Sequence, residues 1–246
     1  MDLSGKVAIV TGGKRIGCVV ARVLAAHGMD LVLTYRGSKQ EAEETAADVV
    51  AAGRRATIVA ADVSTPDGGA IIAAHATTTF GRLDVLVNMA SVYRSRELDA
   101  ITSDSWDADL NVNLRSAFLC AQACAPAMRA AGGGRIVNFA DWLARSGRPH
   151  YQGFTSYYTA KGGVIALTES LGLELAKDQI LVNAIAPGPI LPPPDLSQAE
   201  VDEVAAATPV GRWGGEAEIA KAVLFLCETD FVTGETIRVD GGRHLA

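Results

Sequence analysis

The sequence lacks the features that would tie it to a membrane, to nucleic acid or to an oxidising compartment. No apolar run reaches membrane-spanning length, and residues 1–6 enter a strand pattern without the basic and apolar regions of a signal peptide. No basic run offsets the formal net charge of -6. The four cysteines form no Cys-x-x-Cys pair, and Cys120 and Cys124 are expected to be small buried residues. We therefore expect a reduced, cytoplasmic protein with no metal site and no membrane or nucleic-acid partner.

What the chain does contain is a regular alternation of short apolar runs and Ala-rich helical patterns. Its 246 residues, 49% of them hydrophobic, suit one large α/β domain with a full core. The β-branched runs cover residues 7–10, 31–34, 57–60, 85–87, 136–139, 181–185 and 236–239. Near-continuous apolar strands separated by helices indicate a parallel sheet that is buried on both faces. We predict a single Rossmann-type doubly wound α/β domain over residues 1–246, with a seven-stranded parallel sheet and helices on both faces.

One segment departs from this alternation, at residues 187–209. It contains three consecutive prolines, residues 192–194, and it begins just after a predicted strand. Ligands of open α/β sheets bind at the carboxyl ends of the strands. We therefore expect residues 187–209 to form a lid over a substrate.

Tyr157 and Lys161 are the main candidates for catalysis. They open a long apolar pattern of helical period, and residues four apart on a helix lie about 5–6 Å from each other between Cβ atoms. An ammonium group at that distance would lower the pKa of a phenol, which is near 10 in isolation. The pair could then act as a proton donor and acceptor at neutral pH.

The first predicted strand runs into a glycine-containing turn, residues 11–17, which precedes a helix. Glycines at this position let the backbone approach a pyrophosphate at the helix N-terminus, where free N–H groups favour an anion. The turn therefore favours a dinucleotide site, with an ordinary glycine turn as the alternative.

The end of the second predicted strand indicates which dinucleotide is bound. A site that selects NAD usually has a carboxylate here for the ribose 2′-hydroxyl, whereas this strand end has Arg36 and Ser38. Lys14 and Arg15 lie in the neighbouring turn. Such groups can pair with a 2′-phosphate, so we expect NADP(H). The alternative for Arg36 alone is an exposed loop arginine.

Together these motifs resemble the short-chain dehydrogenase/reductase family over essentially the whole chain, including the closing segment 232–242. The resemblance implies that Asp62 and Val63 border the adenine, and that Lys161 binds the nicotinamide ribose. It implies that Asn113 holds a helix kink and a water that links Lys161 to solvent. The implied cofactor contacts are Gly12, Lys14, Arg15, Ile16, Tyr35, Arg36, Ser38, Asp62, Val63, Asn88, Ala90, Ser91, Tyr157, Lys161, Pro187, Gly188 and Ile190.

Four departures from the common family pattern resemble the pteridine reductase branch, including bacterial dihydromonapterin reductases. They are Arg15 and Ser91 where glycines are usual, the nearby aromatic Tyr93, and Asp141 where a catalytic serine is usual. The C-terminal residues 240–245 are also similar to that branch. The implied substrate contacts are Arg15, Ser91, Tyr93, Asp141 and Tyr157, and the implied catalytic residues are Asp141, Tyr157, Lys161 and Asn113.

The chemistry of these residues is consistent with a pterin. Tyr93 could stack on a flat heterocycle, and Asp141 beside Tyr157 could relay a proton to a ring nitrogen. A ketone would instead need a neutral hydroxyl donor, because a carboxylate repels a developing alkoxide. Two simpler interpretations remain open: Asp141 could cap the following turn, and Tyr93 could be an exposed loop aromatic.

We therefore expect an NADPH-dependent reductase of a C=N bond in a pterin-like small molecule. The alternatives are a carbonyl or 3-oxoacyl-thioester reductase of the same family, and a non-catalytic NADP-binding protein. Three further departures bear on the substrate: a shorter 11–17 turn, Met89 in place of an asparagine, and a longer segment between Asp141 and Tyr157. His150 in that segment is expected to be a loop or interface residue.

Two predicted helices, residues 117–131 and 160–176, are rich in small residues, which permits close helix packing. The family resemblance implies that they pair across a two-fold axis in a homotetramer. The alternative is that both helices pack only on their own sheet.

Overall fold

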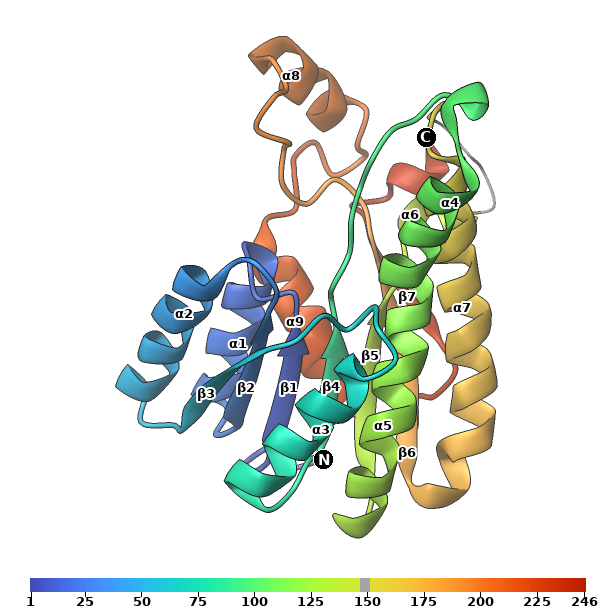
Figure 1. The fold of residues 1–246 in the computed structure, drawn as a ribbon. Helices are drawn as coiled ribbons and strands as arrows, with labels where there is room; N and C mark the ends of the chain where they lie inside the picture. The colour runs from blue at the N-terminus through green and yellow to red at the C-terminus, as the bar shows by residue number, and fades with distance from the viewer. Residues whose placement is uncertain (147–150) are drawn as a thin grey trace.

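The computed structural model of the protein describes residues 1–146 and 151–246 (Figure 1). Within them seven strands form one sheet in the order β3-β2-β1-β4-β5-β6-β7, and every neighbouring pair is parallel. Each predicted run lies within an observed strand, so the predicted parallel sheet is confirmed. The strands are β1 (Val7–Thr11), β2 (Asp30–Tyr35), β3 (Ala56–Ala60), β4 (Val85–Asn88), β5 (Gly134–Phe139), β6 (Ile180–Pro187) and β7 (Thr236–Val239).

The sheet carries helices on both faces because successive side chains of a strand point to opposite faces. Ala8 and Val10 of β1 join a core with α1 (Ile16–Ala26), α2 (Lys39–Ala51) and α9 (Glu216–Glu228). Ile9, between them, joins a second core with α3 (Gly68–Phe80), α5 (Ser116–Ala130) and α7 (Thr155–Leu175). Two buried faces explain why the strands read as continuous apolar runs.

The remaining elements lie mainly around the carboxyl ends of the strands. They are η1 (Leu98–Ala100), α4 (Ser103–Leu110), the π-helical turn η2 (Asn111–Arg115), α6 (Trp142–Ser146), η3 (Ala176–Asp178), α8 (Gln198–Ala206) and η4 (Arg243–Leu245). Figure 1 shows α8 projecting beyond these strand ends, within the segment 187–209. Its function as a lid stays a prediction.

Two expectations from the sequence concern the burial of Cys120 and Cys124 and the length of apolar segments. Cys120 and Cys124 on α5 are fully buried, as expected for small core residues, and burial raises the pKa of Cys120 to about 12. Among the described residues, no helix combines the length and the apolar character needed to cross a membrane.

Close packing of α7 provides a test of the fold. A Cβ at Gly172 would come within 2.7 Å of the backbone nitrogen of Gly234, whereas a Cβ at Gly162 of the same helix would have nothing within 4 Å. We expect Gly172→Ala to lower the free energy of unfolding by about 1–3 kcal/mol, because backbone must shift. Gly162→Ala should be neutral or stabilising by up to about 1 kcal/mol. Urea denaturation measures both, and equal effects would contradict this account of the packing.

Candidate active site

Tyr157, Asp141 and Lys161 lie together at the carboxyl end of β5. Tyr157 and Lys161 occupy successive turns of α7, and Asp141 comes two residues after β5 ends. The Tyr157 hydroxyl donates a hydrogen bond of 2.9 Å to Oδ2 of Asp141. Lys161 Nζ donates to the Phe139 carbonyl oxygen at 2.7 Å and lies 5.6 Å from the centre of the Tyr157 ring. The structure therefore brings together the three side chains that the sequence singled out.

The electrostatics of Tyr157 differ from the expectation based on spacing. Burial, with the Asp141 carboxylate beside it, raises the pKa of Tyr157 well above its ordinary value. Burial also lowers the pKa of Lys161 to about 8, against an opposing effect of Asp141. The predicted lowering of the Tyr157 pKa is therefore not produced by these protein groups alone, because the charged group nearest the phenol oxygen is a carboxylate.

The two oxygens of Asp141 have different partners. Oδ1 accepts a hydrogen bond of 2.9 Å from the backbone N–H of Leu143, and Oδ2 accepts from Tyr157. Asp141 therefore caps the turn into α6, as one interpretation expected, and it also contacts Tyr157. Its part in proton transfer stays a prediction. Burial raises the pKa of Asp141, although both hydrogen bonds and Lys161 act in the opposite direction. The protonated acid can donate a hydrogen bond, as a serine hydroxyl does.

Asn113 lies in the π-helical turn between α4 and α5 and connects it to the segment after β4. Its Oδ1 accepts from the Ser91 hydroxyl at 2.6 Å and from Val92 N–H at 3.1 Å. Its Nδ2 donates to the backbone oxygens of Asp109 at 3.0 Å and Val92 at 3.1 Å. Asn113 therefore fixes Ser91, and a π-helical turn of this kind is frequent at functional sites.

An aromatic wall formed by Tyr93 and Phe154 lies beside Tyr157. Tyr93 stacks on Phe154, with ring centres 4.3 Å apart and planes 17° from parallel, and meets Tyr157 edge-on at 4.9 Å. Tyr93 is still 55% exposed, as expected for a loop aromatic. Its stacking partner here is Phe154, and stacking on a substrate stays a prediction. Phe154 was not among the residues predicted for the site, although it lies only three residues before Tyr157 in the sequence.

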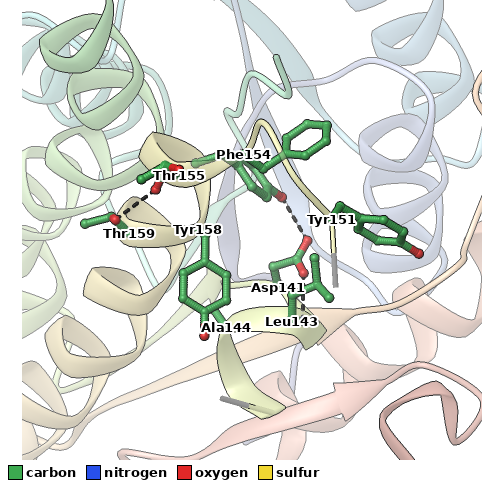
Figure 2. Close-up of a pocket in the computed structure, with 9 residues that line it drawn as sticks. Asp141, Leu143, Ala144, Tyr151, Phe154, Thr155, Tyr158 and Thr159 are labelled. Atoms are coloured by element: carbon green, nitrogen blue, oxygen red, sulfur yellow. Dashed lines mark hydrogen bonds between the residues drawn. The ribbon is translucent and has the colours of Figure 1, made fainter. Parts of the chain in front are cut away.

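A cavity of about 220 Å³ opens beside this group, between α6 and α7. Figure 2 shows Asp141 between the rings of Tyr151 and Tyr158 in this view. The cavity is lined by Asp141, Leu143, Ala144, Tyr151, Phe154, Thr155, Tyr157, Tyr158 and Thr159. Its wall is mainly apolar and aromatic with one carboxyl group, which suits a small, flat or apolar substrate.

A second cavity, of about 520 Å³, lies at the carboxyl ends of β1 to β4. Thr11 shapes it, because its hydroxyl oxygen accepts hydrogen bonds from the N–H groups of Met89 at 3.0 Å and Ala90 at 3.2 Å. Its lining includes Gly12, Lys14, Tyr35, Arg36, Ser38, Asp62, Val63, Ala90 and Ser91, all predicted cofactor contacts.

These residues fit a dinucleotide. Gly12 has φ +75°, and a Cβ there would lie 3.0 Å from the backbone of Met89 and Ala90, so the close approach requires glycine. Among the described residues no side chain caps the N-terminus of α1, so N–H groups of its first turn other than that of Gly17, which donates to the Lys14 carbonyl oxygen, can bind an anion. Arg15, the residue at that N-terminus, has φ 50°, a conformation unfavourable for a residue other than glycine.

Other predicted contacts lie outside this cavity lining. Asn88 is buried and donates to Asn138 Oδ1 at 2.9 Å. The Arg15 guanidinium donates to the Pro192 carbonyl oxygen at 3.4 Å, in the segment 187–209. Ile190 packs in the core, and Gly188 lies against Asp240. Ile16 packs against the same core at the start of α1, and Pro187 ends β6. Cofactor contact stays a prediction for these residues, for Tyr157 and Lys161, and for the residues that line the cavity.

Two of the three cations expected to bind a 2′-phosphate already have acidic partners. Arg36 pairs with Asp62 at 3.2 Å, and Lys14 pairs with Glu41 at 2.7 Å. Hydrogen bonds from Ser64, with Arg36 beside them, hold the pKa of Asp62 below its ordinary value. A 2′-phosphate must therefore compete with the carboxylates of Asp62 and Glu41. Glu41 was not among the residues predicted for the site.

Arg145 lies in the described part of the longer segment after Asp141. Arg145 donates to the Thr236 carbonyl oxygen at 3.2 Å and pairs with Glu235 at 3.3 Å, beside β7. His150, for which a loop or interface position was expected, lies outside the described residues.

Comparison with known proteins identifies the family. The model of the family described as enoyl-(acyl carrier protein) reductase matches residues 12–244. The short-chain reductase protein NovJ of Streptomyces niveus is 39% identical, over 96% of this chain and 93% of its own. The 3-oxoacyl-[acyl-carrier-protein] reductase FabG of Staphylococcus aureus is 35% identical, over 98% of both chains.

Solved structures agree. A short-chain dehydrogenase/reductase from Serratia marcescens superposes with a TM-score of 0.91 at 32% identity, over 99% of this chain and 100% of the other. A blue fluorescent protein from a metagenomic library, in complex with NADPH, gives 0.91 at 34% identity, over 99% of each. Acetoin dehydrogenase from Enterobacter cloacae gives 0.88 at 38% identity, over 98% of this chain and 97% of the other. The chain belongs to the short-chain dehydrogenase/reductase family, whose members are oxidoreductases that use a nicotinamide cofactor.

Proposed function

We propose that this protein is an NADPH-dependent reductase that acts on the carbonyl group of a small molecule. The observation that carries the proposal is the 2.9 Å hydrogen bond between Tyr157 and Asp141, with Lys161 buried one turn away. The phenol of Tyr157 lines a small, mainly apolar cavity, and a second cavity lined by predicted cofactor contacts lies at the carboxyl ends of β1 to β4. The names of two similar proteins, a 3-oxoacyl-[acyl-carrier-protein] reductase and an acetoin dehydrogenase, support carbonyl chemistry.

NADPH, when bound, supplies the hydride. Tyr157 gives its phenolic proton to the substrate oxygen as negative charge develops there. The buried ammonium of Lys161, held by the Phe139 carbonyl oxygen, stabilises the phenolate that Tyr157 leaves behind. Asn113 holds the adjoining helix and Ser91 in place.

Asp141 stands where most family members carry a serine, and its protonation state decides what it can do. As a carboxylate it would repel the developing oxyanion. Burial raises the pKa of Asp141, in the direction of the neutral acid, and a neutral acid can donate a hydrogen bond to a substrate oxygen. Carbonyl reduction is then compatible with Asp141 when it is protonated.

The second candidate is reduction of a C=N bond in a pterin-like ring. Asp141 in place of serine, together with the stacked Tyr93 and Phe154, supports it. A flat nitrogen heterocycle could lie against this wall, and Asp141 with Tyr157 could relay a proton to a ring nitrogen. Arg15 and Ser91 would be further contacts in that case.

The proposal also includes a homotetramer and a lid over the substrate. Phe118 on α5 and Leu173 on α7 are exposed, Leu173 at 85%, which supports pairing of these helices between subunits of a homotetramer. The hydrogen bond from Arg15 to Pro192 supports the segment 187–209 as a lid, since it connects that segment to the N-terminus of α1.

We expect a much higher kcat/KM with NADPH than with NADH. Arg36→Asp should narrow or invert this preference, because one lost charge-assisted pair costs roughly 1.5–3 kcal/mol. Glu41→Gln should strengthen NADPH binding by freeing Lys14, whereas Glu43→Gln, which removes the partner of Lys39 on the same helix, should not. Steady-state kinetics and NADPH titration measure these effects. Equal efficiency of the parent protein with both cofactors would contradict the assignment.

Tyr157→Phe should reduce kcat by about 10²–10⁴ and leave NADPH affinity nearly unchanged, because only the proton donor is lost. Lys161→Ala should weaken both turnover and cofactor binding. The measurements are kcat for the preferred substrate and the NADPH dissociation constant from fluorescence. Normal turnover by Tyr157→Phe would show that another group delivers the proton.

A substrate panel separates the two candidates. We expect the parent protein to prefer a β-ketoester to a dihydropterin, with kcat/KM for the ketoester falling as pH rises through the raised pKa of Asp141. In Asp141→Asn this fall should vanish, because the amide donates at every pH. Asp141→Ser should retain ketoester turnover and depress dihydropterin turnover. A strong preference for the dihydropterin would instead favour the second candidate.

A further inference from the structure

A buried carboxylate of α4, Asp109, connects two segments of the site without belonging to either cavity. Its side chain is 2% exposed, whereas Asp104 and Asp107 on the same short helix are exposed. Oδ2 of Asp109 accepts hydrogen bonds of 2.6 Å from Arg96 Nη1 and 2.6 Å from the Ser156 hydroxyl. A single oxygen therefore joins the segment after β4 to the start of α7.

The Arg96 partner belongs to the segment that carries Tyr93. The backbone N–H of Arg96 also donates to the Gly153 carbonyl oxygen at 2.7 Å, in the residues that lead to Phe154. Gly153 approaches Ser95 so closely that a Cβ there would lie 2.4 Å from the serine hydroxyl oxygen. Arg96 therefore connects the two halves of the Tyr93–Phe154 stack, and Asp109 fixes the guanidinium of Arg96.

The Ser156 partner immediately precedes Tyr157. Ser156 is 3% exposed in the first turn of α7, and within the described part of the chain no side-chain cap restrains that turn. The hydrogen bond from Ser156 to Asp109 supplies a restraint there. It limits rotation of the turn that carries the Tyr157 phenol.

The two hydrogen bonds to Oδ2 do not satisfy both oxygens of the buried Asp109 carboxylate. Its Oδ1 is buried and has no hydrogen-bond partner among the described residues. A buried carboxylate with an unpartnered oxygen is unfavourable in itself. Such a residue is retained at a functional site when it fixes the geometry of its neighbours.

We propose that Asp109 is a positioning residue: through Arg96 and Ser156 it sets the distance between the Tyr93–Phe154 wall and the Tyr157 hydroxyl. It thereby controls both the fit of the substrate and the transfer of the proton. This inference rests on the proposed function in so far as Tyr157 is taken as the proton donor. The adenosine end of the dinucleotide cavity, around Lys14 and Arg36, lies outside the reach of Asp109 and keeps its binding groups.

The test compares Asp109→Asn with Asp107→Asn, a matched change at an exposed site on the same helix. We expect Asp109→Asn to lower kcat/KM for the preferred substrate by about tenfold or more, because a displacement of about 1 Å at a reacting group has effects of this size. The NADPH dissociation constant should change less than twofold. Asp107→Asn should leave all of these constants unchanged.

Hydrogen exchange measured by mass spectrometry gives a readout that does not depend on activity. In Asp109→Asn, exchange should accelerate in residues 89–97 and 151–157 and stay unchanged in β1 and α1. Ser156→Ala, which keeps the Arg96 pair, should lower kcat with little effect on KM and accelerate exchange at the start of α7 only. The double variant should be no worse than Asp109→Asn alone, because the two residues act as one unit.

Unchanged kcat/KM in both Asp109→Asn and Ser156→Ala would overturn the inference. So would acceleration of exchange spread evenly over the whole sheet, which indicates a general loss of stability. If Asp109→Asn fails to fold, Ser156→Ala decides by the same criteria. Normal turnover by Tyr157→Phe would instead refute the proposed function, and the exchange pattern would still decide whether Asp109 positions the two segments.

Discussion

Because the seven strands described here run parallel, their carboxyl ends meet at one edge of the sheet, and every connection from that edge must cross to a helix. The glycine turn after β1, the Arg36 corner after β2, the Asp62 turn after β3 and the Asp141 turn after β5 therefore lie along the same edge of the sheet. The strand order reverses direction between β1 and β4, which opens a crevice at that point. The candidate chemistry depends on this alignment, because it brings residues that are far apart in the chain to the same edge.

The same alignment explains how much of the protein could be predicted from its sequence. Strands buried on both faces are continuous apolar runs, so all seven observed strands contain a predicted run. Tyr157 and Lys161 could be paired because helical spacing is a local property. Phe154, Glu41 and Asp109 were missed because their significance comes from tertiary contacts with Tyr93, Lys14 and Arg96. The residue pattern along one helix or strand does not show which residues of other elements will contact it.

The pKa of Tyr157 is a second property that the sequence did not predict correctly, because it depends on tertiary contacts. Spacing predicted a lysine near the phenol, and the lysine is there, but spacing does not specify where its ammonium points. Lys161 is directed to the Phe139 carbonyl oxygen, and the group that contacts the phenol oxygen is the Asp141 carboxyl. Burial and this carboxyl then raise the pKa of Tyr157. The direction of a pKa shift follows from the nearest charge and the extent of burial, neither of which a sequence interval supplies.

The choice between a carbonyl and a ring C=N substrate reduces to the charge of the Asp141–Tyr157–Lys161 group. With Asp141 neutral and Lys161 charged, the group carries a net positive charge, which stabilises an oxyanion that develops on a carbonyl oxygen. With Asp141 ionised the two charges cancel, and the site offers a hydrogen-bond acceptor that suits a substrate with N–H donors. The similar proteins named for carbonyl substrates favour the first state, and replacement of the usual serine by an acid permits the second. Burial raises the pKa of Asp141 and so shifts this carboxyl group in the direction of the neutral acid, which is the state that the proposed carbonyl reduction requires.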